Sequence, residues 1–122
     1  MRGLLKKRMN SYDAFLRCQT HLIELAHAYI ERVILEQFVE AINKCEDGDC
    51  KIILKKLCDL FALSTIQENK GWYLEQDYMQ GAKTKAIRKM VYKLCKDVRS
   101  EAAFLVEAFA IPQSCIAAPI AL

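Results

Sequence analysis

Two parallel rows of apolar residues at helical spacing run through the first third of this 122-residue chain. The first row is Phe15, Leu22, Ala26, Tyr29 and Val33. The second row is Leu16, Ile23, Ile30, Ile34, Phe38 and Ala41. Residues that recur three, four or seven positions apart share one face of a helix, and two neighbouring rows make a stripe wider than one partner helix would cover. The pattern therefore predicts a long helix over Ser11–Lys44 that is buried against more than one neighbour.

A second helical stretch follows an acidic turn at residues 46–49. Asp49 is expected to cap a helix that runs from about Cys50 to Glu68. Gly71 is expected to end that region in the left-handed conformation that helix ends favour. The side chains expected to be buried on this helix are Ile53, Leu54, Leu57, Leu60, Phe61 and Ser64.

The remaining third holds a short aromatic segment and one more long helix. Residues 72–80 read WYLEQDYMQ and predict one or two helical turns packed onto the long helices. A last helix is expected from about Ala82 to Phe109, with a kink or restart near residues 99–101, where Ser100 is a good N-cap. Pro112 is expected to end it. Its apolar row is Ile87, Val91, Leu94, Val98, Ala102, Leu105 and Phe109.

These elements predict an all-α fold: an antiparallel helical bundle of three long helices plus a short aromatic-rich helical segment. Only four glycines and two prolines occur, too few for a chain built from tight β-turns. One domain is expected over residues 1–122, with residues 1–10 as a poorly ordered lead-in. A chain of this length buries a small share of its surface and is expected to lean on a partner for stability.

Six cysteines require an interpretation: Cys18, Cys45, Cys50, Cys58, Cys95 and Cys115. Residues 1–9 contain no apolar core of a signal peptide. We therefore expect reduced thiols in an intracellular compartment, most of them packed as small apolar groups. No apolar run reaches the roughly 18–20 residues of a membrane span.

No residue is assigned to catalysis or to metal binding. His21 and His27 are six positions apart and would project in different directions, unlike the four-residue spacing of a helical zinc pair. Cys45 and Cys50 lack a second pair of ligands that would complete a zinc site. Nucleophile and phosphate-loop motifs are absent from the sequence.

A cluster of cations marks the last helix: Lys83, Lys85, Arg88, Lys89, Lys93 and Lys96. It reads either as the solvated side of an amphipathic helix or as a basic face for phosphate groups. Only Tyr92 interrupts the cations, which is too little aromatic surface for a single-strand nucleic-acid binder. The first reading is favoured, because amphipathic helices routinely have such a side.

Six stretches, in this order, resemble peroxisomal acyl-CoA oxidases, and the plant members look closest. They are residues 57–66 (LCDLFALSTI), 68–73 (ENKGWY), 82–87 (AKTKAI), 94–99 (LCKDVR), 105–112 (LVEAFAIP) and 118–121 (APIA). Residues 24–38 agree more loosely. The resemblance covers most of the chain, and the order of the motifs makes it specific.

The resemblance implies the carboxy-terminal helical domain of an enzyme that uses FAD, converts acyl-CoA to trans-2-enoyl-CoA and passes electrons to oxygen, giving hydrogen peroxide. In that family the domain packs on a dehydrogenase-like core and helps to form the homodimer, while the catalytic glutamate and the main FAD and acyl-CoA contacts lie upstream. No catalytic role is therefore carried over to Glu68 or Glu75, and this chain alone is expected to be inactive and not to bind FAD.

The family setting implies the peroxisome, although Ile120-Ala121-Leu122 lacks the cation of an S-K-L address. A fragment of a longer chain, a truncated gene product and a standalone paralogue all remain open. The alternative function is a standalone helical interaction module that uses the basic face on an anionic partner.

Overall fold

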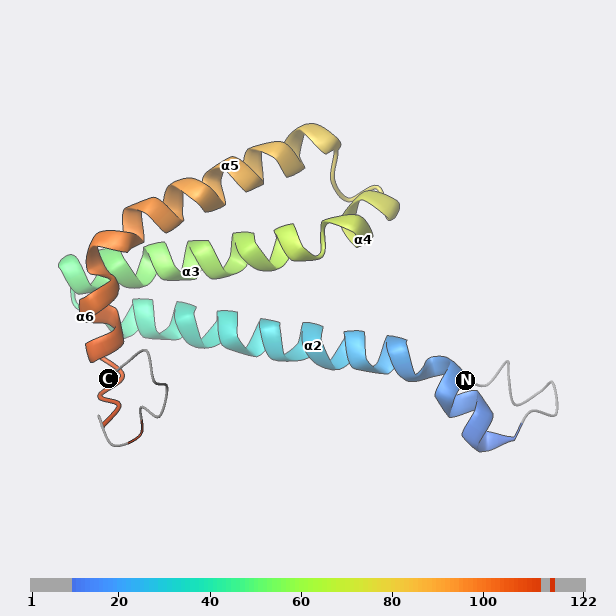
Figure 1. Cartoon of the computed structure of the whole chain (residues 1–122). Coiled ribbons are helices and arrows are strands. Elements are labelled where there is room, and N and C mark those ends of the chain that lie inside the picture. The colour runs from blue at the N-terminus through green and yellow to red at the C-terminus, as the bar shows by residue number, and fades with distance from the viewer. Residues whose placement is uncertain (1–9, 113–114, 116–122) are drawn as a thin grey trace. The chain divides into compact units, whose positions relative to one another are not determined.

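The computed structural model describes residues 10–112 and Cys115 (Figure 1). The expected lead-in, apart from Asn10, and the APIA motif at residues 118–121 lie outside the described residues. The chain divides into two compact units, residues 1–44 and residues 45–122. All regular structure in the described part is helical, which confirms the all-α class.

The first unit consists of helix α2, Ser11–Lys44, whose bounds match the prediction. Its 34 residues correspond to about 50 Å of helix at 1.5 Å per residue. Asn10 fixes the start, because its Oδ1 accepts a hydrogen bond from the Tyr12 backbone N–H at 3.2 Å. Asp13 in the first turn and Lys44 in the last complement the helix dipole.

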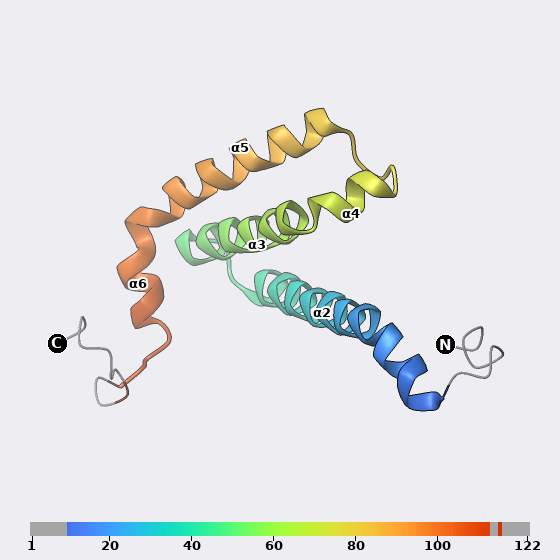
Figure 2. The ribbon, with the colours of Figure 1, turned by 45° about the vertical axis from the view of Figure 1, so that its right-hand side comes forward.

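The second unit is a helical hairpin that continues into a short bent end (Figures 1 and 2). Helices α3 and α5 pack against each other and run in opposite directions, so the antiparallel arrangement is confirmed for this pair. The elements are α3 (Asp49–Glu68), α4 (Lys70–Glu75), α5 (Gly81–Val98), the 3-10 turn η1 (Arg99–Glu101) and α6 (Ala102–Glu107).

The core of this hairpin is small. Cys58 on α3 is 7% exposed and Val91 on α5 is 8% exposed. The other apolar residues predicted to be buried on α3 are only partly covered, from Ile53 to Phe61. The predicted burial of this face is therefore partial, because α5 shields one side of α3.

The start of α3 differs from the prediction in its cap. Gly48 occupies the N-cap position and Asp49 is already the first helical residue, with no side-chain cap hydrogen bond. Asp49 still lies in the first turn, where its negative charge suits the helix dipole. The acidic turn is instead joined to the helix by the Lys51 Nζ donating to Asp47 Oδ1 at 2.8 Å.

The break after α3 also forms differently. Gly71 does not adopt a left-handed conformation: it lies inside α4, and Asn69 ends α3 with its side-chain amide donating to the Thr65 carbonyl at 3.0 Å. The left-handed residue is Asp77, with φ 55°, just after the end of α4. Around it, the Tyr78 N–H donates to the Tyr73 carbonyl at 3.0 Å, the six-residue hydrogen bond of a Schellman helix end.

The predicted restart near residue 100 is confirmed as a change of helix type. α5 ends at Val98, η1 covers Arg99–Glu101, and α6 begins at Ala102. Ser100 does not act as the N-cap, because Glu101 occupies that position before α6 without a side-chain bond. The last helix also ends earlier than predicted, and the chain turns at Ala110 with φ 48° before Pro112.

Candidate functional site

The largest unpartnered feature of the first unit is the α2 apolar face. At about 100° per residue its members span an arc of roughly 140° on the helix. Each side chain is between 38% and 66% exposed, although each is large and apolar. The α2 apolar face consists of Tyr12, Phe15, Leu16, Leu22, Ile23, Tyr29, Ile30 and Ile34.

The width of the stripe was predicted from sequence, and within the first unit α2 has no second described helix to pack against. Single exposed apolar side chains are common on proteins, whereas a continuous rimmed row marks an interaction surface. Arg17, Glu24 and Glu31 lie on the other side of the helix, as predicted, and are exposed or partly exposed. The helix is therefore amphipathic, and its apolar side is available to a partner.

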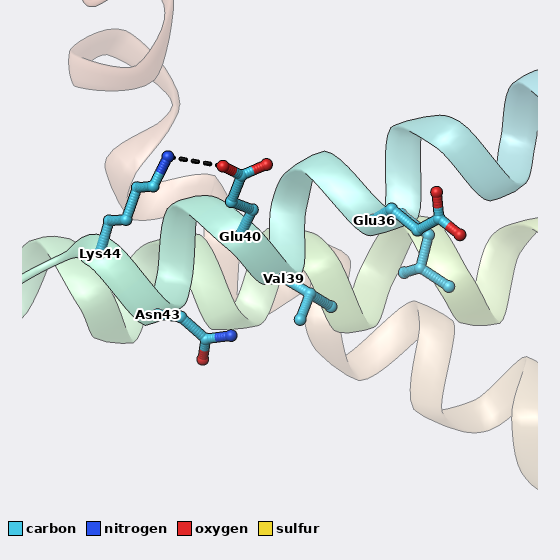
Figure 3. A pocket seen from close by; sticks show the side chains of 6 residues that line it. Glu36, Val39, Glu40, Asn43 and Lys44 are labelled. Atoms are coloured by element: carbon cyan, nitrogen blue, oxygen red, sulfur yellow. Dashed lines mark hydrogen bonds and ion pairs between the residues drawn. The ribbon is translucent and has the colours of Figure 1, made fainter.

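An open hollow lies near the carboxyl end of α2 (Figure 3). Its charged groups are already paired along the helix: Lys44 with Glu40, and Glu36 with Arg32 at 3.6 Å. Arg32 also stands 5.5 Å from the centre of the Tyr29 ring. Exposed pairs of this kind contribute about 0.3–0.5 kcal/mol each. The hollow is lined by Leu35, Glu36, Val39, Glu40, Asn43 and Lys44.

The two histidines are not brought together. His21 Nδ1 lies 3.5 Å from Glu24 Oε2 on the exposed side of the helix, and His27 is exposed one and a half turns away. Among the described residues, no group of three or more His, Cys, Asp or Glu side chains is placed to hold a metal ion. Likewise, no helix in residues 10–112 combines the length and apolarity needed to cross a membrane.

The cysteines are free thiols of differing exposure. Cys58 is buried, and that burial, reinforced by the negative charge of Asp59, raises the pKa of its thiol. A raised pKa keeps the thiol protonated and unreactive near neutral pH. Cys50, Cys95 and Cys115 are exposed, so the prediction that most cysteines pack as small apolar groups was wrong for these three.

An aromatic cluster at α4 was not foreseen as a unit. The rings of Trp72 and Tyr78 stack with centroids 5.5 Å apart, and the Tyr73 ring meets Trp72 edge-on at 5.2 Å. The left-handed turn at Asp77 reverses the chain and returns Tyr78 to Trp72. The sequence signal for this contact was the placement of aromatic residues around a turn-forming aspartate: Trp72 and Tyr73 come before Asp77, and Tyr78 follows it.

A small cavity at the same end of the hairpin is lined in part by Gln67. The Gln67 Oε1 is buried and has no hydrogen-bond partner. The only hydroxyl among the lining residues, that of Thr84, donates to the Gly81 carbonyl at 2.8 Å. The lining residues are Ile66, Gln67, Lys70, Met79, Thr84 and Ile87.

The cations of α5 form a second surface of note. We call it the α5 basic face and define it as Lys85, Arg88, Lys89, Lys93 and Lys96, all of which are exposed. None of them takes part in the ion pairs found between described residues. Successive like charges three or four positions apart destabilise a helix by about 0.2–0.5 kcal/mol per pair. Lys83 is exposed too but lies on another side of the helix.

The sequence matches a known family over its whole length: a family model described as acyl-CoA oxidase covers residues 1–122. This chain belongs to the acyl-CoA oxidase family. The acyl-coenzyme A oxidase 2 of Arabidopsis thaliana, named as peroxisomal, is 42% identical over 95% of this chain. An acyl-coenzyme A oxidase-like protein of Mus musculus is 33% identical over 95%. No solved structure gives a significant match.

The acyl-CoA oxidase match places this chain against a small part of longer proteins. It spans 17% of the Arabidopsis relative's length and 18% of the mouse relative's length. The family resemblance inferred from the motifs is therefore confirmed, including the similarity to a plant member.

FAD, the cofactor that the family resemblance implies for the full enzyme, does not fit the hollow on α2. A dinucleotide needs an enclosing cleft with backbone or cationic donors for its diphosphate. The hollow on α2 is open and presents the carboxylates of Glu36 and Glu40, which would repel phosphate. No step of the oxidase reaction can be derived from these side chains.

Proposed function

We propose that this chain is the carboxy-terminal helical domain of a peroxisomal, FAD-dependent acyl-CoA oxidase, in which it packs on the catalytic body and supports the homodimer. The α2 apolar face carries this proposal, because it gathers eight large apolar side chains, each 38% to 66% exposed, on one side of one helix. Two findings support the same conclusion: the chain belongs to the acyl-CoA oxidase family, and it matches only a small part of the length of its relatives.

The whole enzyme would oxidise acyl-CoA to trans-2-enoyl-CoA and reduce oxygen to hydrogen peroxide. In this proposal the described residues do not touch the reacting atoms. Their task is to present an apolar surface of about 33 Å along α2, from Tyr12 to Ile34, at 1.5 Å per residue. Burying such side chains yields about 25 cal/mol per Å² of apolar surface removed from water.

A standalone interaction module is the second candidate, and the exposed cations of the α5 basic face are the observation that favours it. The two candidates differ in the force that drives association. Contacts through the α2 apolar face would persist at high salt, whereas contacts through cations would weaken steeply as salt rises.

The test is sedimentation of the purified chain together with binding of a dye that fluoresces on apolar surfaces. We expect dye binding and self-association that salt does not reverse. The double variant Leu22→Asp/Ile30→Asp should lose both, while the helix content of the chain by circular dichroism is retained.

The matched control is Glu24→Gln/Glu31→Gln, which changes two residues on the opposite side of α2. It should associate as the parent chain does. A parent chain that is monomeric, well folded and unable to bind the dye would contradict the proposal. So would acyl-CoA-dependent peroxide production by the chain alone.

A further inference from the structure

The α5 basic face concentrates the positive charge of the molecule. The chain carries a net charge of +3, whereas α5 alone carries six cations and one acid, Asp97, for a net +5. Because both charges are counted from the full sequence, the rest of the chain has a net charge of 3 − 5 = −2. Residues 1–9 carry four further cations and no acid, and within residues 10–122 the excess of positive charge lies on α5.

The direction of these cations is set by the packing of α5. Helix α5 lies along α3 in both views of the hairpin (Figures 1 and 2), and Val91 is its buried residue. At about 100° per residue, Lys85, Lys89 and Lys96 fall within roughly 40° of one another and about 120–160° from Val91. The three lysines therefore project away from the hairpin.

The face has the form of a ridge and not of a pocket. From Lys85 to Lys96 it extends about 16 Å along the helix. Four of its five cations are lysines, which act as point charges, and the single Arg88 has no second guanidinium beside it to build a forked phosphate site. Such a surface responds to the density of negative charge and not to the shape of one ligand.

Tyr92 lies in the middle of the ridge and is 65% exposed. Tyrosine favours the boundary between water and lipid headgroups. One aromatic ring cannot supply the row of stacking platforms that single-stranded nucleic acid requires. The apolar side of α5 is already occupied by α3, so the helix cannot insert into a bilayer and would remain on its surface.

We propose that the α5 basic face docks the protein peripherally onto an anionic phospholipid surface through Lys85, Arg88, Lys89, Lys93 and Lys96. The attraction is electrostatic. It decays over about a Debye length from the lipid surface and weakens as the salt concentration rises. This inference is argued from the charge and packing of α5 and does not depend on the proposed function.

The test is co-sedimentation of the 122-residue chain with vesicles of phosphatidylcholine, with and without phosphatidylserine. We expect binding to the anionic vesicles at low salt and its loss at high salt. Each removed cation should weaken binding about fivefold. The variant Lys85→Gln/Lys89→Gln/Lys96→Gln should therefore bind about 100-fold more weakly, with unchanged helix content by circular dichroism.

Two further variants separate the ridge from general charge. Lys44→Gln/Lys55→Gln/Lys70→Gln removes the same charge from exposed lysines elsewhere and should bind nearly as the parent does. Lys85→Arg/Lys89→Arg/Lys96→Arg keeps the charge and should bind as well as the parent.

Several results would overturn the proposal. The first is equal binding to neutral and anionic vesicles. The second is an equal loss of vesicle binding in the ridge variant and in the variant changed elsewhere. The third is binding to duplex DNA or polyglutamate without binding to anionic vesicles. A chain whose dye binding and self-association fail while vesicle binding persists would sink the proposed function and leave this inference standing.

Discussion

Helix α2 and the α3–α5 hairpin start from the same kind of sequence pattern and reach different degrees of burial. On the hairpin, Val91 and Cys58 are less than a tenth exposed, because each helix covers the other. On α2, residues of equal apolarity such as Leu25 and Tyr29 are 66% and 60% exposed. The comparison teaches that periodicity decides which residues share a face, whereas a partner decides whether that face leaves water.

The sharpest test of this difference uses one substitution in both regions. Val91→Ala should lower the free energy of unfolding by about 2 kcal/mol, because it removes buried methyl groups and leaves a cavity. Val39→Ala on α2, where the side chain is 47% exposed, should change it by less than about 0.5 kcal/mol. Urea unfolding followed by circular dichroism measures both, and equal effects would break the comparison.

The helix starts offer the next largest effect. Asn10→Ala removes the side-chain acceptor for the Tyr12 N–H and should cost α2 about 1 kcal/mol. Gly48→Asn should stabilise α3 by up to a few tenths of a kcal/mol, because Gly48 at the N-cap has no side chain to accept a capping hydrogen bond. Amide hydrogen exchange of the first turns measures each effect, and no change on losing the Asn10 side chain would refute its capping role.

The turn between α3 and α5 gives an effect whose sign is informative. Gly71→Ala should stabilise the hairpin by about 0.5–1 kcal/mol, since Gly71 is helical and an added Cβ meets no atom within 4 Å. Asp77→Gly should stabilise it by a similar amount, because Asp77 has a positive φ. Thermal unfolding checks both. Destabilisation by Gly71→Ala would contradict the helical conformation of Gly71 and support the left-handed conformation expected from the sequence.

The smallest effect concerns pH. The hydrogen bond and positive charge of Lys51 lower the pKa of the Asp47 carboxyl below the ordinary aspartate value. A pKa that is lower in the folded state contributes stability above the unfolded value, about 4, and that contribution is lost as pH falls. Lys51→Met should raise the Asp47 pKa toward the ordinary value, as measured by NMR titration. An unchanged titration would show that the pair does not persist in solution.

Local patterns predicted the helices well and their capping residues poorly. The bounds of Ser11–Lys44 were correct because the signal is repeated over nine turns. Gly71 was assigned the left-handed position because glycine adopts it freely, but α4 begins at once and Asp77 takes that conformation. Caps depend on single residues, so one competing turn changes the outcome.

Burial and the site were harder to foresee for a different reason. Leu57 and Phe61 were expected to be buried, yet the residues that would cover their flanks are not in the hairpin. The cations from Lys85 to Lys96 could be placed on one helix from sequence, but their direction away from α3 required the structure. The stacking of Trp72 on Tyr78 depended on a turn that the sequence did not predict.

Hydrogen exchange of the dilute chain tests the central claim most directly, because it reports the stability of each helix separately. If the α2 apolar face belongs against a larger flavoprotein body, the backbone of residues 11–34 should exchange at least tenfold faster than that of α3 and α5. A helix without tertiary cover opens readily. Equal protection of residues 11–34 and of the α3–α5 core in the monomer would contradict it.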